Sequence, residues 1–382
     1  MGLKQIIRDC LIDWRRNRKY NDDFTAKHYI KMTNCPLLSA KDKKTIDLYW
    51  AKFHIKFKEY EWFRMYYHVT GIHDPRFVPQ PVAEELLSKY YNRQEFASAY
   101  ADKNMFSFIL PTIKFPNTLG KRINGRYLDN KGNCFGEEVN SSYIDTVFNE
   151  IYYIKSINET VKKGIEIVIK EANGSFQGKG VRIYTIKEPS DLKAVIERYH
   201  SKDYIIQEKI IQHPFFAQFN PDSVNIIRIT TWRIGDQIHI LCPCIRFGVK
   251  GSATDVSFIN GTEVLNAIKI HNDGVIDDYY ITLAGEKILL PKDYTRTVPK
   301  WSSIIDLISK NAMNLHYFGF IGWDVTVDEN DSIICLEYNI KCPGTVVYQF
   351  AHGPLAGDNT DLLLEFLTKD ENIELIPKCI RI

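Results

Sequence analysis

The sequence predicts an α+β protein that begins with a mainly helical region, because its hydrophobic pattern changes along the chain. In residues 1–98 aromatic and aliphatic side chains recur at steps of three and four, as in TIDLYWAKFHIKFKEYEWFRMYYHV, which is the period of a helix. From about residue 100 short β-rich runs bounded by turn residues take over, with helical stretches between them. Several runs follow one another across short turns, so we expect mostly antiparallel strands.

Length and composition are those of an ordinary globular protein. The 382 residues correspond to two or three domains of roughly 150 residues each. Apolar residues make up 45% and charged residues 25%, and the net charge is only +2. A near-neutral chain lacks the basic surface that nucleic-acid binding requires, so we expect no nucleic-acid partner.

The cysteines and the apolar runs predict a cytoplasmic location. The eight cysteines are scattered and include no Cys-x-x-Cys pair, which favours reduced, buried thiols in a cytosolic protein. The N-terminal stretch has no apolar core long enough for a signal peptide. No run approaches the roughly 20 apolar residues of a transmembrane segment.

The helical region by itself indicates no chemistry. Its pattern is interrupted at Gly71 and Pro75, and Pro79 and Pro81 precede a further helical run, VAEELLSKYY. We interpret this region as a helical cap or substrate domain.

The first candidate for ligand binding is a glycine-rich loop between two β-runs, IEIVIK-EANGSFQGKG-VRIY. Glycines let backbone amides approach phosphate oxygens closely, and a lysine at the strand end supplies a fixed positive charge. Lys179 in the loop either does the same or is solvated. We predict a phosphate-binding flap formed by Lys170, Gly174, Ser175, Gly178, Lys179 and Gly180.

This loop does not match the common phosphate loops. A P-loop reads G-x-x-x-x-G-K-[ST] and leads into a helix, whereas three residues separate Gly174 from Gly178 here and a β-run follows. A protein kinase places its glycine loop before the lysine strand and carries H-R-D and D-F-G, which the chain lacks. The loop is therefore a flap of a third kind, with a glycine-rich hairpin that binds nothing as the alternative.

The second candidate is an acidic hairpin, IGWDVTV-DEND-SIICLEYN. If Asn330 and Asp331 form a two-residue turn, Asp324 faces Glu337 directly, and Asn339 lies on the same face as Glu337. Opposed carboxylates only ~5 Å apart repel unless a cation or a proton lies between them. Oxygen ligands without His or Cys suit Mg²⁺, so we predict a metal site there. A surface acidic hairpin is the alternative.

A third and weaker signal is the β-run YIIQEKIIQ between the flap and the hairpin. As a hinge, its backbone would bond adenine, and a carboxylate would take an amino or hydroxyl group. We assign Gln207, Glu208 and Ile210 to nucleotide binding. An ordinary strand with an exposed glutamate is the alternative.

Two arginines complete the candidate set. Arg228 and Arg246 lie on the runs VNIIRITTW and CIRFGVKGSATD. Arginine suits the charge that develops on a transferring phosphoryl group or an acyl phosphate. Either residue alone is more often at the surface, but their position before the acidic hairpin favours a catalytic role, chiefly for Arg246.

Taken in order, these pieces resemble the ATP-grasp superfamily, with a lysine and glycine flap, a hinge glutamate, and an acidic residue before a Glu-x-Asn strand. The spacing from Asp324 to Glu337 is similar to that of the family's metal ligands. ATP-grasp enzymes often have an Asp-Lys pair before the flap, and Asp102-Lys103 resembles it. The resemblance implies two α+β subdomains that clamp ATP, with Lys103 as a further phosphate ligand.

A narrower likeness is to the sugar-transfer-associated ATP-grasp branch, which occurs with polysaccharide biosynthesis. Its QxHP…PxSVNTxR segment reads IIQHPFFAQFNPDSVNIIR here, and the likeness covers roughly residues 65–355. Its closing GWD…E-x-N-x-x-P-G pattern reads Gly322-Trp323-Asp324, Glu337-Tyr338-Asn339 and Pro343-Gly344.

The chain departs from this branch where the acceptor is expected to bind. An isoleucine replaces the threonine of the SVNTxR segment, Val256 replaces the asparagine that follows Asp255, and Asn260-Gly261 replaces a double glycine. The nucleotide and metal positions are intact, so the departures concern the identity of the substrate.

The resemblance implies an ATP- and Mg²⁺-dependent ligase that joins a carboxylate to an amine through an acyl phosphate, in the biosynthesis of capsule or another surface polysaccharide. The expected partners are an amine and a small carboxylate such as a uronic acid or nucleotide sugar. A kinase acting on a hydroxyl and a nucleotide sensor without turnover are the alternatives.

The patterns and the resemblance together predict five segments. These are an N-terminal helical region (1–98), the first part of the ATP-grasp domain (99–160), a glycine-flap subdomain (161–212), a C-terminal subdomain with the metal site (213–360) and a C-terminal tail (361–382).

Overall fold

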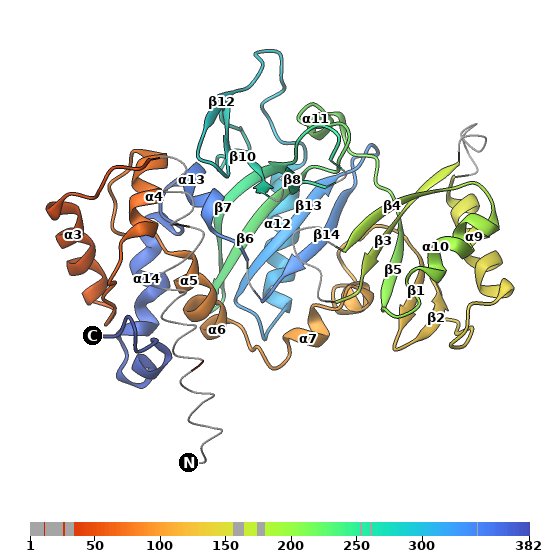
Figure 1. The fold of residues 1–382 in the computed structure, drawn as a ribbon, viewed down its shortest axis with the longest axis horizontal. Helices are drawn as coiled ribbons and strands as arrows, with labels where there is room; N and C mark the ends of the chain where they lie inside the picture. Colours follow the sequence, from red (N-terminus) through yellow and green to blue (C-terminus); the bar gives the residue numbers. More distant parts are fainter. Residues whose placement is uncertain are drawn as a thin grey trace.

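The computed structural model describes most of the chain. The described residues are Leu11, Ala26, 34–155, 164–173, 180–252, 254–259, 262–341 and 343–382. Figure 1 shows three parts side by side, with helices at one end, a large sheet in the middle and a smaller sheet at the other end. The predicted α+β class and the helical character of the first region are confirmed.

The first part is built from short helices. Ser39 begins α3 with a capping box, in which its hydroxyl accepts from the Asp42 amide, and Gly71 ends α4 in the left-handed conformation. None of the described helices is long and apolar enough to cross a membrane. The helices are α3 (Ala40–Ala51), α4 (Glu61–Thr70), α5 (Gln80–Val82), the π-helix η1 (Ala83–Leu87), α6 (Ser88–Tyr91), α7 (Ala97–Tyr100), η2 (Lys103–Met105) and α8 (Phe106–Ile109).

The smaller sheet is antiparallel and has the order β2-β1-β5-β3-β4 in the described part of the chain. Its strands are β1 (Thr118–Ile123), β2 (Arg126–Asp129), β3 (Ile165–Glu171), β4 (Val181–Ile186) and β5 (Tyr204–Glu208). Helices α9 (Ser141–Lys155) and α10 (Pro189–Glu197) cover one face, where Ile167, Ile169 and Ile206 are fully buried. Because strand side chains alternate, Val168 and Lys170 point away from these helices.

The larger sheet has the order β12-β11-β10-β7-β6-β13-β14 among the described residues. One face packs on α12 (Trp301–Asn314), and the other packs on α13 (Val346–His352) and the N-terminal helices. Its strands are β6 (Ile226–Ile234), β7 (Gln237–Phe247), β10 (Asn266–Lys269), β11 (Tyr279–Thr282), β12 (Lys287–Leu289), β13 (Phe320–Val327) and β14 (Ile333–Asn339). Smaller elements are α11 (Pro214–Ala217) and the ribbon of β8 (Ser257–Ile259) and β9 (Thr262–Val264).

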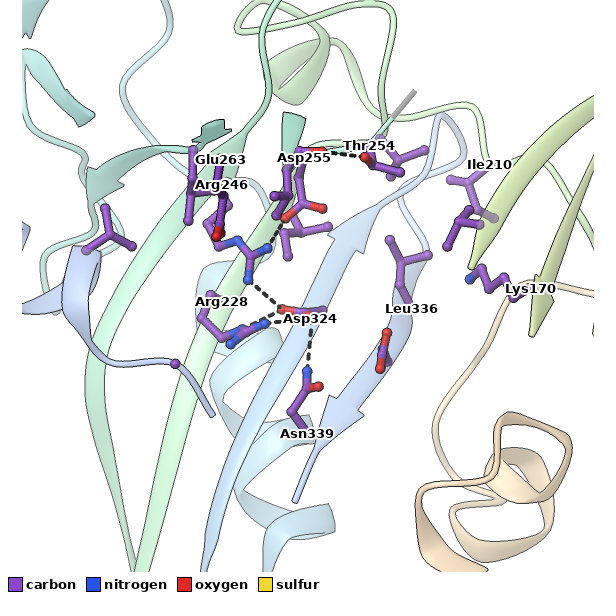
Figure 2. Close-up of a pocket in the computed structure, with 18 of the residues that line it drawn as sticks. Lys170, Ile210, Arg228, Arg246, Thr254, Asp255, Glu263, Asp324, Leu336 and Asn339 are labelled. Atoms are coloured by element: carbon purple, nitrogen blue, oxygen red, sulfur yellow. Dashed lines mark hydrogen bonds and ion pairs between the residues drawn. The ribbon is translucent and has the colours of Figure 1, made fainter. Parts of the chain in front are cut away.

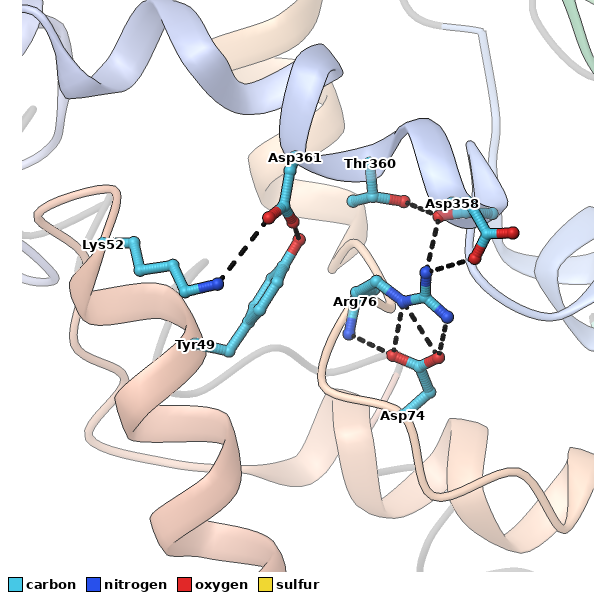
Figure 3. A network of polar contacts seen from close by, with 8 residues as sticks. Tyr49, Lys52, Asp74, Arg76, Asp358, Thr360 and Asp361 are labelled. Carbon is cyan, nitrogen blue, oxygen red and sulfur yellow. Dashed lines mark hydrogen bonds and ion pairs between the residues drawn. The ribbon is translucent and has the colours of Figure 1, made fainter.

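The last residues of the chain pack against the N-terminal helices. They form α14 (Thr360–Leu364) and three 3-10 helices, η4 (Gly357–Asn359), η5 (Glu365–Thr368) and η6 (Asp370–Leu375). In Figure 3 Arg76 bonds both Asp74 and Asp358, and the Tyr49 hydroxyl donates to Asp361 at 2.7 Å. The segment that follows residue 360 is therefore part of one packed unit with the first region.

The β13–β14 hairpin confirms the predicted pairing of Asp324 with Glu337, but the predicted two-residue turn is wrong. The ladder continues to Val327 and Ile333, and Asp331 adopts a positive φ of 61° in a longer loop. The register shifts by one residue beside Leu336, which is a β-bulge. The extra loop residue and the bulge compensate, so the residues at the predicted metal site still face each other.

Asp328, at the start of this loop, is not a solvated turn residue. It is buried, and its carboxylate accepts bonds from the amides of Asn330 and Ser332 at 2.9 and 2.8 Å. The carboxylate therefore holds the loop together, in the manner of an Asx turn.

Candidate active site

A cavity of about 630 Å³ lies where the two sheets meet, and it collects most of the predicted site residues. Figure 2 shows Lys170 on the smaller sheet facing Leu336 on the hairpin, with Arg228, Arg246 and Asp324 deeper on the larger sheet. The predicted residues that line it are Lys103, Lys170, Glu208, Ile210, Arg228, Arg246, Asp324, Glu337 and Asn339.

One end of the cavity is an apolar slot. Val168, Val181 and Ile183 line it from the smaller sheet, and Ile210 and Leu336 also line it. The bulge explains why Leu336 and its neighbour Glu337 both reach the cavity, since a regular strand would turn one of them away. A flat apolar slot of this kind suits an aromatic base.

Two lysines border this slot. The Lys103 backbone amide donates to the Ala172 carbonyl at 3.1 Å, which ties the first lysine to the end of β3. Its ammonium lies 3.6 Å from a Glu337 carboxylate oxygen and is 7% exposed. Burial lowers the pKa of Lys170 to about 8, an effect that Glu337 opposes and Lys103 reinforces. Two cations that line one cavity, of which Lys103 is buried and Lys170 partly buried, favour an anionic ligand.

The predicted metal ligands converge at the centre of the cavity. Asp324 and Glu337 are direct cross-strand partners, and Asn339 donates its amide to an Asp324 oxygen at 3.2 Å. Gly322 lies opposite Asn339, where a Cβ would meet Pro343 at 3.0 Å, so glycine lets the following loop approach. These residues fit Mg²⁺, because both carboxylates offer oxygen lone pairs and no nitrogen or sulfur ligand competes in this set.

The arginines are held by carboxylates. Arg228 forms a bidentate pair with Asp324, at 2.5 and 2.9 Å. Arg246 pairs with Asp255, lies 3.8 Å from Asp324 and donates to the Tyr348 hydroxyl at 3.0 Å. Burial opposes the charge on each arginine, but the carboxylates outweigh it and raise both pKa values. Both guanidinium groups therefore stay charged.

The remaining predicted residues occupy other positions. Glu208 lines the cavity and accepts from the Asn117 amide at 3.3 Å, whereas Gln207 lies outside the lining and donates to the Pro116 carbonyl. Gly180 joins β3 to β4 through its carbonyl, which accepts from the Glu171 amide, and is also outside the lining. Gly174, Ser175, Gly178 and Lys179 lie outside the described residues.

Sequence reasoning missed several residues of the cavity wall. Gln80 and Glu84 reach the cavity from the helical region, and the Gln80 side chain accepts from the amide and hydroxyl of Thr345. Tyr348 on α13 lines the cavity beside both arginines. None of these residues carries a recognisable motif. The one local signal is the π-helix that contains Glu84, a distortion often found at functional sites, and it shows only in three dimensions.

Two antiparallel sheets that meet at a cavity, with two lysines on one side and a Glu-x-Asn strand on the other, define an ATP-grasp protein. The chain belongs to the sugar-transfer-associated ATP-grasp family, whose model matches residues 82–360. A search of curated proteins finds no match.

Solved structures give low similarities. The N5-carboxyaminoimidazole synthetase from Staphylococcus aureus, complexed with ADP, is 11% identical with a TM-score of 0.40, over 74% of this chain and 59% of that one. D-alanyl-alanine synthetase A from Vibrio cholerae O1 biovar eltor is 11% identical with a TM-score of 0.41, over 73% and 68%. The ATP-grasp ligase PsnB, complexed with a minimal precursor, Mg and ADP, is 15% identical with a TM-score of 0.38, over 73% and 62%. The chain thus spans less than two thirds of the first of these proteins.

Proposed function

We propose that this protein is an ATP- and Mg²⁺-dependent carboxylate–amine ligase that works through an acyl phosphate. The observation that carries the proposal is the order of groups along one cavity, from an apolar slot through two lysines and a Glu-x-Asn strand to two buried arginines. Family membership supports it. The family's description, sugar-transfer associated, supports a sugar or uronic acid as one substrate. We propose in addition a role in surface polysaccharide biosynthesis and a cytoplasmic location.

The nucleotide would bind at the apolar end. Val168, Ile183 and Leu336 would enclose the base, and the backbone from Glu208 to Ile210 would supply hydrogen bonds to its edge. Lys103 and Lys170 would hold the phosphates. Asp324, Glu337 and Asn339 would hold Mg²⁺, which neutralises charge on the phosphate oxygens when bound.

The reaction would proceed at the arginine end. A substrate carboxylate oxygen attacks the γ-phosphorus of ATP and ADP leaves, which gives an acyl phosphate. The amine nitrogen then attacks the acyl carbon, phosphate leaves with its bonding pair, and the nitrogen loses a proton. Arg246, held by Tyr348 and close to Asp324, would stabilise the negative charge that develops in both steps, and fixed buried charge of this kind needs little reorganisation.

ADP release from Mg·ATP tests the proposal, with a panel of carboxylates in the presence and absence of mixed amines. Release that requires a carboxylate and rises with amine is the expected result. Glu337→Gln should reduce release to background, because one charged metal ligand is lost. Glu329→Gln, in the exposed loop of the same hairpin, is the matched control and should behave as wild type.

Two outcomes would contradict the ligase. ADP release with hydroxyl acceptors, in the absence of any carboxylate substrate, would indicate the alternative, a kinase. Asp255 lines the cavity and would offer such an enzyme a carboxylate side chain. Calorimetric ATP binding without any release would indicate a nucleotide sensor.

A further inference from the structure

The cavity continues beyond the arginines into a compartment lined mainly by aliphatic side chains. These residues, which we call the apolar compartment, are Ile226, Val256, Leu265, Leu283, Val346 and Val347. Five of them, all except Ile226, belong to or pack against one continuous hydrophobic cluster. The compartment is therefore a single apolar surface, separate from the slot at the nucleotide end.

The sheet register places its floor beside Arg246. Arg246 is the cross-strand partner of Ala267, which in turn is the partner of Ile281. Two residues further along, the Leu283 amide donates to the Leu265 carbonyl at 2.8 Å. Side chains two apart on a strand share a face, so Leu265 lies diagonally across from Arg246, at roughly 7–8 Å between Cα atoms.

The two residues that bind Arg246 are next in the sequence to residues that line the walls of the apolar compartment. Tyr348, whose hydroxyl accepts from Arg246 at 3.0 Å, directly follows Val346 and Val347 on α13. Asp255, the carboxylate partner of Arg246, directly precedes Val256. A carboxylate held at Arg246 would therefore have aliphatic side chains on the floor and on two sides of whatever group it bears.

A sugar ring would be poorly matched to these surroundings. Each hydroxyl of a uronic acid needs a hydrogen-bond partner when water is removed, and the aliphatic side chains supply none. Glu263 also lines the cavity near Arg246 (Figure 2), but one carboxylate meets only part of that need. An aliphatic or aromatic group has no hydrogen bonds to lose, and its transfer out of water is favourable.

We propose that the carboxylate activated by this protein belongs to an acid with an apolar side chain, the class that includes leucine and phenylalanine. The inference rests on the proposed ligase activity and deepens it. The carbohydrate would then supply the amine, so that the product is an apolar acyl group joined to an amino sugar.

The test measures ADP release with Mg·ATP and glucosamine as the amine. Leucine, phenylalanine and 4-methylpentanoate are compared with galacturonate, glucuronate and aspartate. We expect kcat/KM at least tenfold higher for the best apolar acid than for any polar one. Leu283→Gln should raise the KM for that acid tenfold or more, and Leu283→Ala should shift preference towards phenylalanine.

The control is Leu289→Ala on β12, because Leu289 is 75% exposed on the same sheet and does not line the cavity. Thermal melting and ATP-binding calorimetry on each variant verify that the nucleotide end is intact. Release with uronates and not with apolar acids, or an unchanged KM in Leu283→Gln, would overturn the inference and leave the ligase standing. Release with none of the acids would overturn both.

Discussion

At the scale of single residues, Asp324 connects the two charged parts of the site, the proposed metal ligands and the arginines. Both of its oxygens bond Arg228, one also receives the Asn339 amide, and Arg246 lies 3.8 Å away. The residue is only 8% exposed. A carboxylate buried to this degree is tolerated because its partners are charged and hydrogen-bonded to it. The proposed metal ligand is therefore also the residue that positions Arg228.

Arg246 is expected to serve the chemical step rather than ATP binding. Arg246→Lys keeps the charge but cannot reach Asp255 and Tyr348 together, since lysine lacks the planar fork. We expect kcat to fall by about 10²–10³-fold with an unchanged Kd for ATP. Steady-state kinetics and calorimetry measure the two quantities. Arg233→Lys, on the same sheet but outside the cavity lining, should change neither.

Lys170 predicts a pH dependence of ATP binding. Its pKa of about 8 in the folded protein lies below the ordinary value of a lysine. The charge that attracts phosphate is thus complete well below pH 8 and is lost as the pH rises through that value. We expect the Kd for ATP to increase above pH 8, with proton uptake on binding in that range. Arginine stays charged in this range, so the Kd for ATP of Lys170→Arg should not rise above pH 8. A rise equal to that of wild type would refute the assignment of Lys170 to phosphate binding.

At the scale of elements, β-bulges direct side chains in two of the strands that form the site, β14 and β7. In β7 the register with β6 shifts near Cys242, which has a φ of 44°. The carbonyl of Pro243 accepts from the Ile270 amide at 3.0 Å and from His352 Nε2 at 2.9 Å. The bulge therefore fastens α13, and with it Tyr348, over the larger sheet.

The burial of His352 should make the protein sensitive to acid. Burial lowers the pKa of His352 to about 4, whereas the unfolded chain has a value of roughly 6.5. Between these values the unfolded state binds the extra proton, so stability falls as the pH drops from about 6.5 to 4. Urea midpoints at pH 7 and 4.5 should differ less in His352→Gln than in wild type. Exposed His200→Gln should retain the full difference.

At the scale of the whole molecule, the helices from residue 34 onward and the last residues of the chain build one unit. The Lys56 amide donates to the Ile380 carbonyl at 2.7 Å, and the Ile382 amide donates to the His54 carbonyl at 3.0 Å. Figure 1 shows α14 beside α3 and α4, at the end of the molecule opposite the smaller sheet. This unit carries Gln80 and Glu84, so the packing of the ends supports one wall of the cavity.

Leucines on α14 test this packing. Leu364 is fully buried in the shared core, whereas Leu362 is 38% exposed. Leu364→Ala should lower the free energy of unfolding by about 2–5 kcal/mol, and Leu362→Ala by roughly 0.5 kcal/mol or less. Denaturant titration measures both. Equal effects would show that the end of the chain contributes little to the core.

The sequence by itself determined the features that depend on local pattern. Hydrophobic period gave the α+β class and the helical start, and both were confirmed. The motifs gave the family. An assumed two-residue turn placed Asp324 opposite Glu337, and the pairing holds although the turn is longer, because the bulge at Leu336 restores the register.

Only the tertiary structure decided what depends on contacts between distant segments. Tyr348, Gln80 and Leu283 carry no local signal, because an apolar or amide side chain looks the same in a core and in a cavity wall. The pairing of Arg246 with Asp255 and the lowered pKa of Lys170 likewise arise from burial and from neighbours far along the chain. Local pattern specifies which residues share a face. The packing of one face on another decides which of them meet a substrate.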